Sequence, residues 1–364
     1  MQGGVVGNSR KAMSRAREFA DAYGLRVPIL LAPMAGACPA SLSIAVANGG
    51  GMGACGVVMM SSDQIADWVG EMRSGSNGAF QLNTWIPDPD PVRNPAHELT
   101  IRKFLSNWGP EVPEDAADAA PPDFVSQCEA MLDAEPAVIS SIMGLYPPEF
   151  VSRMKQRKIR WFATATTVAE AVMAEEAGAD VIVAQGMEAG GHRGAFDGAD
   201  AERNMIGLFS LVPAIADVVR VPVVAAGGIA DSRGVSAALL LGASAVQIGT
   251  GFLRAPEAKL PSAWADSLGD AAPEDTIATR AFSGRLGRSI RTEYAVSATS
   301  PDAPAPAPYP IQRHLTQAMR NEAVRSNDSA GMQAWAGQSA RLAPTTSATN
   351  TTVALWEGVQ AILA

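Results

Sequence analysis

The chain alternates between short apolar runs and segments whose apolar residues have helical spacing. Eight such runs lie at residues 27–34, 52–58, 79–85, 137–143, 161–166, 181–185, 221–229 and 245–252. Repeated strand–helix units of this kind produce parallel strands joined by crossover helices. Because eight units are the number that closes a barrel, the pattern predicts an α/β fold, a (β/α)8 TIM barrel, in preference to a doubly wound open sheet.

Two long segments depart from the alternation. Residues 87–136, rich in Pro and Asp, are too long for a structureless connection inside a domain, so we interpret them as an insertion after strand three. After the eighth run the alternation stops, and residues 332–342 and 353–363 have helical patterns. We therefore expect a cofactor-binding barrel over residues 1–253. A helical extension over residues 254–364 would then pack on the barrel or cover its site.

Composition excludes several classes of partner. The net charge is −9 and no cluster of Lys and Arg stands out, which argues against a nucleic acid or an anionic membrane as partner. Cys38, Cys55 and Cys128 show no CxxC motif and no metal-ligand spacing, so we expect free thiols, no bound metal and a reducing, cytoplasmic location. The first 23 residues lack the apolar core of a secretory signal, and no apolar run approaches the roughly 20 residues of a membrane span.

The loop at residues 185–194 is the strongest candidate for a catalytic site. It follows the sixth apolar run and combines four glycines with Gln185, Glu188, His192 and Arg193. Barrel enzymes keep their chemistry in loops at the carboxyl ends of the strands, and imidazole titrates near neutral pH. The alternative is a surface turn with a solvated histidine; we favour the catalytic interpretation because the chain has only three His.

Paired glycines follow the seventh and eighth predicted strands. They are Gly227 and Gly228 in one loop and Gly249 beside Thr250 in the other. In this fold the loops after these two strands commonly bind phosphate through free backbone N–H groups, and glycine lets the backbone approach the phosphate oxygens. Two tight turns without a ligand are the alternative.

A mononucleotide such as FMN fits this phosphate site better than a dinucleotide. No GxGxxG sequence opens a helix after strand one, so a Rossmann-type site is not indicated. The flavin ring would lie across the strand ends, against Pro33, Met34, Asn83 and Gln185. Amide side chains suit the pyrimidine edge of a flavin, which presents donors and acceptors together.

These residues belong to motifs through which the chain resembles the nitronate monooxygenases, formerly called 2-nitropropane dioxygenases. The motifs are APMAG at 32–36, FQLN at 80–83, QGMEAGGHRG at 185–194, AAGGIA at 225–230 and VQIGT at 246–250. Of these motifs, EAGGHRG is the one that is specific to this family. Further similarity continues into the extension, at residues 283–285, 309–312 and 335–338. One departure is the stretch 140–144, SSIMG, where many family members have a second His.

The resemblance implies a role for each residue of the site. His192 would be the catalytic residue. The FMN contacts would come from Pro33, Met34, Asn83, Gln185, Gly190, Gly191, Ala226, Gly227, Gly228, Gln247, Gly249 and Thr250. The implied reaction is FMN-dependent oxidation of alkyl nitronates, and of nitroalkanes, with O2 to carbonyl compounds and oxidised nitrogen species. A homodimer is the expected assembly.

Three other functions remain open at this point. One is an FMN enzyme that uses NAD(P)H, such as an enoyl-thioester or quinone reductase. Another is a nucleotide-substrate dehydrogenase, although that chemistry needs a nucleophilic Cys where this loop has His192. The third is a barrel that binds a phosphorylated ligand without catalysis.

Overall fold

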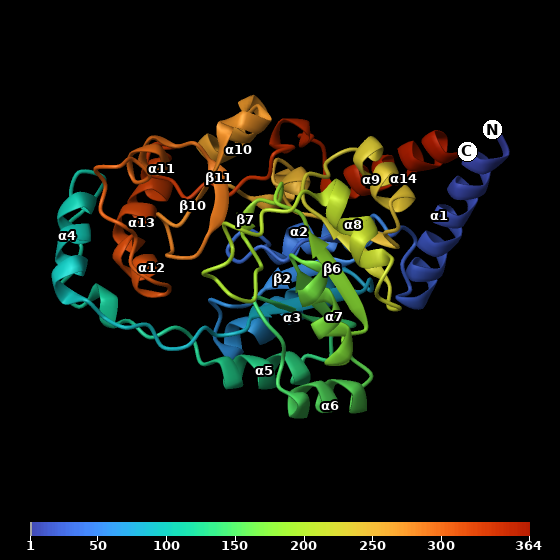
Figure 1. The fold of residues 1–364 in the computed structure, drawn as a ribbon, viewed down its shortest axis with the longest axis horizontal. Helices are drawn as coiled ribbons and strands as arrows, with labels where there is room; N and C mark the ends of the chain where they lie inside the picture. Colours follow the sequence, from blue (N-terminus) through green and yellow to red (C-terminus); the bar gives the residue numbers. More distant parts are fainter. Residues whose placement is uncertain (1) are drawn as a thin grey trace.

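The computed structural model describes residues 2–364, with side chains from residue 8 onward. Eight parallel strands form one sheet in the order β1-β9-β8-β6-β5-β4-β3-β2. A bridge between Leu30 and Met52 joins the two outer strands and closes the barrel. The predicted TIM barrel is therefore confirmed (Figure 1). The strands are β1 (Ile29–Leu31), β2 (Gly53–Gly56), β3 (Phe80–Trp85), β4 (Val138–Ile142), β5 (Arg160–Ala165), β6 (Val181–Gln185), β8 (Val223–Ala226) and β9 (Ala245–Ile248).

Helices surround the barrel on its outer face. Those between strands are α2 (Ala40–Asn48), α3 (Ser62–Gly75), α5 (Phe124–Asp133), α6 (Pro148–Gln156), α7 (Val168–Glu176), α8 (Leu208–Ala216) and α9 (Ser232–Leu240). The eighth position in the ring is taken by α14 (Ala348–Leu363), which packs against α2 and α9. The division of the chain at residue 253 stays a proposal, and α14 is the part of the extension that returns to the barrel.

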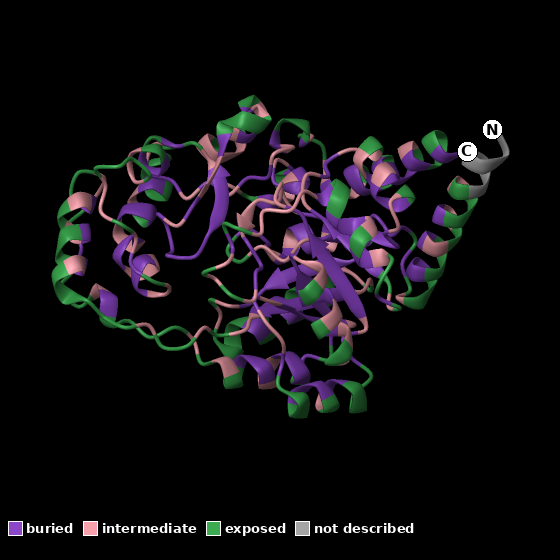
Figure 2. Cartoon of the chain, in the orientation of Figure 1, coloured by how far each residue is buried: buried purple, intermediate pink, exposed green. Residues whose placement is uncertain are grey.

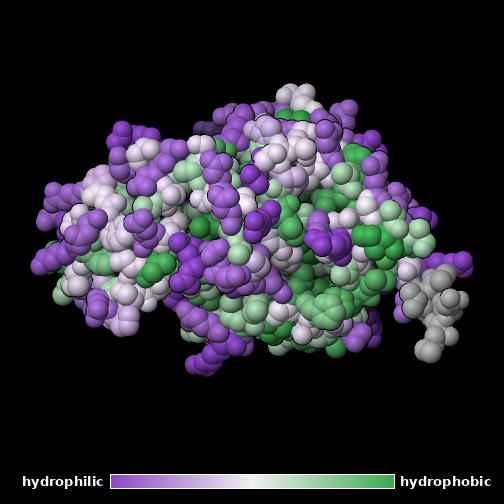
Figure 3. Space-filling model, turned by 90° about the horizontal axis from the view of Figure 1, so that it is seen from above, coloured by the Kyte–Doolittle hydropathy of each residue, from purple (hydrophilic) through white to green (hydrophobic). Residues whose placement is uncertain are grey.

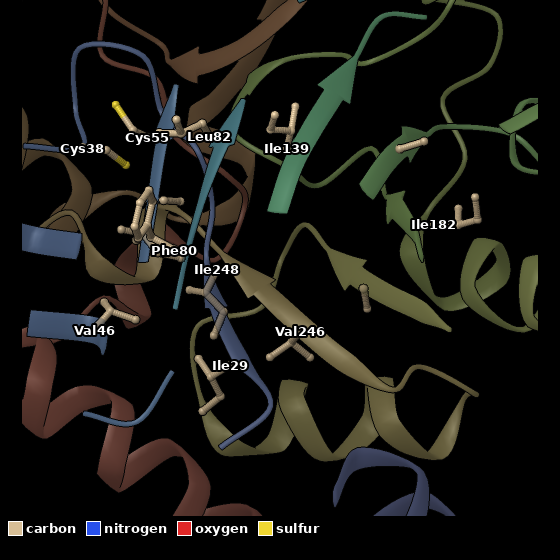
Figure 4. Packing of buried hydrophobic residues seen from close by; sticks show 14 of the residues in the cluster. Ile29, Cys38, Val46, Cys55, Phe80, Leu82, Ile139, Ile182, Val246 and Ile248 are labelled. Carbon is tan, nitrogen blue, oxygen red and sulfur yellow. The ribbon is translucent and has the colours of Figure 1, made fainter. Parts of the chain in front are cut away.

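Alternation along the strands separates two apolar layers. Ile29 and Leu31 of β1 face the helices, whereas Leu30 points into the barrel. Figure 4 shows the outer layer, and Figure 2 shows that the strands are buried while the helices expose their outer faces. At the amino-terminal end of the strands, Phe19 and Tyr23 pack against Phe162 and fill the barrel. Helix α1 (Gln2–Ala22) thus covers one end and leaves the carboxyl ends of the strands for a site.

A second lobe covers those carboxyl ends, and we call it the cap lobe. It combines α4 (Pro95–Leu105) and η1 (Ala116–Asp118) of the insertion with part of the extension, which contributes β10 (Thr276–Thr279), β11 (Gly287–Ile290), α11 (Glu293–Ser297), α12 (Ile311–Leu315) and α13 (Gln317–Ser326). Ile101 and Leu105 of the insertion pack with Phe282 and Leu315 of the extension in one apolar cluster. Two segments far apart in sequence therefore form one unit, seen at the left of Figure 1.

The extension is less helical than its sequence pattern predicts. Strands β10 and β11 form a hairpin that pairs with β7 (Gly191–His192) of the barrel loop. Residues 332–342 were predicted as a helix, and this prediction was wrong: they form an irregular segment with a bridge from Trp335 to Ser289 and the single turn η5 (Ala340–Leu342) at their end. Close contacts to the barrel loops outweigh the local pattern here. The remaining helices are α10 (Ser262–Asp270) and the single turns η2 (Thr250–Phe252), η3 (Pro256–Ala258) and η4 (Pro273–Asp275).

Cys38, Cys55 and Cys128 are buried and none is in a disulfide within residues 2–364. Over the same residues, no helix has both the length and the apolar character needed to cross a bilayer.

Candidate active site

One cavity of about 400 Å³ opens at the carboxyl ends of the strands, between the barrel and the cap lobe. All thirteen predicted site residues line it, namely Pro33, Met34, Asn83, Gln185, Gly190, Gly191, His192, Ala226, Gly227, Gly228, Gln247, Gly249 and Thr250. The parallel sheet explains why, since it brings the ends of all eight strands to the same place. The volume is in the range of sites for small molecules and cofactors.

The two glycine loops form a cradle of free backbone donors. Gly227 and Gly228 have φ of +117° and +64°, conformations that favour glycine. The N–H groups of these residues, and of Gly249 and Thr250, donate no hydrogen bond within residues 2–364. Such a cluster of unpaired N–H groups attracts an anion. The structure thus provides donors where the sequence predicted a phosphate.

The extension completes this cradle, which the sequence pattern did not show. The Thr250 Oγ1 accepts a hydrogen bond of 3.0 Å from the Gly337 N–H, so its own proton remains available. The Ser339 hydroxyl donates to the Gly228 carbonyl at 2.6 Å. Residues 336–339 therefore lie across the loops after β8 and β9, and the extension is part of the site.

A buried polar network holds the amide side chains at the strand ends. Asn83 donates through Nδ2 to Ser140 Oγ at 3.0 Å, and that hydroxyl donates to Gln81 Oε1 at 3.0 Å. Gln81 in turn donates through Nε2 to Gln247 Oε1 at 3.1 Å. In the described chain this leaves the Oδ1 of Asn83 and the Nε2 of Gln247 unpartnered. One amide acceptor and one amide donor are thus fixed beside the cavity. The pyrimidine edge of a flavin, which presents donors and acceptors together, requires such a pair.

Gln185 is engaged differently. Its Oε1 accepts a 2.8 Å hydrogen bond from the Gly194 N–H, and its Nε2 donates to the His192 carbonyl at 3.0 Å. Both polar atoms therefore hold the two sides of the loop that begins at this residue. A direct contact between this amide and a cofactor stays a prediction.

Glu188 and Arg193 also support the loop. Both carboxylate oxygens of Glu188 accept from the Leu208 N–H, at 2.9 and 3.0 Å, at the first turn of α8. Arg193 is buried and donates to the carbonyls of Gln185 and Asn204 at 2.6 and 2.8 Å. These contacts favour structural roles for both side chains, because a carboxylate at a helix N-terminus satisfies N–H groups that the helix cannot.

His192 lies at the centre of the wall between barrel and cap lobe. It belongs to β7, pairs with Gly287 of β11, and its Nε2 lies 2.7 Å from the Ser283 hydroxyl. The imidazole packs edge-on between Trp85 and Trp335, with ring centroids 4.6 and 4.8 Å away. Its half-buried ring is thus fixed on three sides by residues of both lobes.

Burial, and after it the positive charges of Arg313, Arg285 and Arg320, together lower the pKa of His192 to about 3. The imidazole is therefore neutral near pH 7. A neutral imidazole has a lone pair that can accept a proton, which an imidazolium cannot do.

Two arginines of the cap lobe face this cavity without a carboxylate partner. Arg313 and Arg320 line it, and neither is in an ion pair within the described residues. The Nε of Arg313 is buried without a hydrogen-bond partner, and Arg320 is bound by neutral acceptors, one of them Gln333 at 3.0 Å. Burial lowers the pKa of Arg320 to about 9. Buried charge without a counter-ion is costly, so this arrangement favours an anionic ligand.

The residues predicted from the sequence line the barrel side of the cavity, and most residues of its cap side were not predicted. Tyr309 and Trp335 belong to the stretches of family similarity in the extension, and both line the cavity. Ser283 was noted only as part of a motif, although its neighbour Gly284 was a signal for a tight turn. Nothing in the local pattern pointed to Arg313 or Arg320.

Comparison with known proteins places these observations in a family. A sequence model described as nitronate monooxygenase matches residues 18–357. A nitronate monooxygenase of Paraburkholderia phytofirmans is 36% identical over 90% of each chain. A probable nitronate monooxygenase of Staphylococcus aureus strain Newman is 35% identical, covering 88% of this chain and 91% of its own. The structure of nitroalkane oxidase from Streptomyces ansochromogenes aligns with a TM-score of 0.85 at 31% identity, covering 93% of this chain and 98% of that one.

Proposed function

The chain belongs to the nitronate monooxygenase family, and we propose that it binds FMN and oxidises alkyl nitronates with O2. Neutral nitroalkanes would be substrates as well, after loss of their α-proton. The products are carbonyl compounds and oxidised nitrogen species. The observation that carries the proposal is that His192, whose pKa is lowered by burial, lines the same cavity as the glycine cradle and two arginines without a carboxylate partner.

The groups around the cavity fit FMN. The free N–H groups of the two glycine loops and the Thr250 hydroxyl would hold its phosphate. Asn83 Oδ1 and Gln247 Nε2 offer one acceptor and one donor for the pyrimidine edge of the ring. When bound, the flavin supplies an acceptor for electrons from the substrate and passes them to O2.

The protein's own part is to bind the anion, exclude water and move a proton. His192 takes the α-proton of a neutral nitroalkane through its unprotonated ring nitrogen. Arg313 and Arg320 stabilise the negative charge of the resulting nitronate, or of a nitronate that arrives ionised. Trp85 and Trp335 shield the imidazole from water and keep its orientation.

Anaerobic spectroscopy tests the reaction class. We expect the purified protein to show a flavin spectrum, and an alkyl nitronate to bleach it in the absence of O2. NADPH added instead is expected to leave the spectrum unchanged. Bleaching by NADPH alone would favour an FMN enzyme of the enoyl-thioester or quinone reductase type, and a colourless protein that takes up no FMN would favour a binding function.

Removing the positive charge of Arg313 tests the anion site. Arg313→Met keeps a long side chain and removes the charge, so kcat/KM for an alkyl nitronate should fall roughly 10- to 100-fold, the effect of one charged hydrogen bond. Steady-state O2 consumption with the preformed nitronate measures this. Arg325→Met is the matched control, since Arg325 is an exposed residue of α13 paired to Glu322. Equal kinetics in the two variants would remove Arg313 from substrate binding.

Location and assembly are further parts of the proposal. The buried free thiols favour a reducing compartment, which supports a cytoplasmic location. A homodimer would cover exposed apolar side chains on α8, α9 and α14, which include Phe209, Leu240 and Val353. Figure 3 shows apolar side chains gathered over the barrel side of the molecule, at the right of the view.

A further inference from the structure

Ser283 joins the cap lobe to the imidazole of the barrel. Its side chain is fully buried, and its Oγ lies 2.7 Å from His192 Nε2. The same oxygen lies 3.3 Å from the Arg285 N–H and 3.2 Å from the Arg285 carbonyl. A tight turn holds these atoms in place, since Gly284 has a φ of +87° and a Cβ there would lie 2.4 Å from the Ala307 carbonyl.

Arg285 is itself fixed. Its guanidinium is buried and forms an ion pair of 2.9 Å with Asp88, at the start of the insertion. The backbone that carries the Ser283 contacts is therefore also held through the Arg285 side chain. The Ser283 hydroxyl has little freedom to leave the imidazole.

The single hydroxyl proton of Ser283 limits which hydrogen bonds these contacts can be. The hydroxyl has one proton and two neighbouring acceptors, the Arg285 carbonyl and His192 Nε2. If the hydroxyl donates to His192, the buried Arg285 carbonyl loses the one hydrogen bond that the described chain offers it. If the hydroxyl donates to the Arg285 carbonyl, His192 must carry a proton on Nε2 and donate a hydrogen bond to Ser283 Oγ. Only the second arrangement makes every contact a hydrogen bond, and buried polar groups are rarely left unpaired.

The other ring nitrogen is then the free one. His192 Nδ1 has no hydrogen-bond partner in the described residues, and it is not among the polar atoms that are both buried and unpaired there. His192 lines the cavity, so its Nδ1 is open to a bound molecule. Which nitrogen carries the proton is set by the hydrogen bond that the other one makes.

We propose that Ser283 is a positioning residue that holds His192 with its proton on Nε2 and so presents the Nδ1 lone pair to the substrate. This inference rests on the proposed function and names the atom that does the proton transfer. A neutral nitroalkane gives its α-proton to Nδ1, and the C–H electron pair stays on the substrate as the nitronate. The imidazolium formed in this step donates through Nε2 to Ser283. A nitronate supplied already ionised needs no such transfer.

Substrate pairs give the kinetic test. With Ser283→Ala, kcat/KM for a neutral nitroalkane should fall roughly 10- to 100-fold, the usual cost of losing a partner that orients a reacting side chain. With the preformed nitronate, kcat/KM should stay within about threefold. Ser283→Thr keeps the hydroxyl and should restore much of the loss. Ser289→Ala is the matched control, because Ser289 is equally buried in the same hairpin and its hydroxyl donates to Ile290. Equal losses on both substrates, or no loss on either, would overturn the proposal.

A second measurement does not depend on the substrate. The chain has three His, so ¹⁵N-histidine labelling of the flavin-loaded protein gives few resonances to assign. We expect a protonated Nε2 and an unprotonated Nδ1 for His192, and a mixture of both forms in Ser283→Ala. A protonated Nδ1 in the wild type contradicts the proposal. If instead the wild type turns over neither nitro compound, the proposed function fails, and the ¹⁵N shifts still decide the role of Ser283.

Discussion

Replacing His192 by asparagine is expected to lower kcat/KM for neutral nitroalkanes by about 10³-fold, within the range that general base catalysis contributes. The amide has no lone pair basic enough to accept the α-proton. It is smaller than the imidazole and does not extend to the Nε2 position, so the contact with Ser283 is lost, but it introduces no steric clash and the loop and the flavin site should stay intact. Stopped-flow reduction of the flavin by nitroethane at neutral pH measures the step directly.

The control for this variant is a substrate that has already lost its proton. With a preformed alkyl nitronate, His192→Asn should retain most of its turnover, because the proposed anion site, Arg313 and Arg320 in the cavity lining, is left unchanged. The visible spectrum should show the same flavin content as the wild type. If the variant turns over nitroethane as fast as the wild type, His192 is not the base. If turnover of both substrates and the bound flavin are lost together, His192 is needed for the structure of the loop.

The low pKa of His192 limits how strong a base it can be. Burial and three arginines favour the neutral imidazole, which keeps it ready to accept a proton but weakens its attraction for one. In the proposed mechanism two of these arginines, Arg313 and Arg320, also stabilise the nitronate that forms. Stabilisation of the product anion would therefore supply much of the driving force for proton transfer. In this proposal a weak base and cationic side chains act together: His192 accepts the proton and the arginines stabilise the anion.

The barrel half of this site was predictable from sequence because its signals are local. Apolar runs of regular spacing define the strands, and the chemistry of a parallel barrel lies at their carboxyl ends. Glycines at the ends of β8 and β9 mark the cradle. His192 lies in a segment whose glycine content disfavours a helix or a long regular strand. These features do not depend on where distant parts of the chain pack.

The cap half could not be predicted because it depends on packing between distant segments. Residues 332–342 have helical spacing, yet they form an irregular segment that contacts the barrel loops. Ser283 and Arg313 reach the site only because the insertion and the extension share one apolar cluster. Pairing of β11 with β7 could not be foreseen either, since β7 is two residues long. Tertiary contacts outweigh local pattern in such segments.

Gly190→Ala is expected to weaken FMN binding at least about 100-fold, through the extension rather than through direct contact. A Cβ at this position would lie 2.5 Å from the Gly337 nitrogen and 2.6 Å from the Ala336 carbonyl carbon. Both are backbone atoms, so relief requires the whole segment 336–339 to move. That segment donates three hydrogen bonds to the loops around the site. Two go to the cradle, from Gly337 to Thr250 and from Ser339 to Gly228, and one goes to the loop after β6, from Gln338 to Glu188.

The size of the effect follows from those three contacts. Each hydrogen bond is worth about 1 kcal/mol, and three of them correspond to roughly 100-fold in affinity. Titration of the apoprotein with FMN, followed by quenching of flavin fluorescence, gives the dissociation constant. Gly70→Ala is the control, because Gly70 lies in α3 with no atom near its Cβ position. An unchanged dissociation constant in Gly190→Ala, with the apoprotein folded, would mean that the extension closes over the site without contributing to the phosphate cradle.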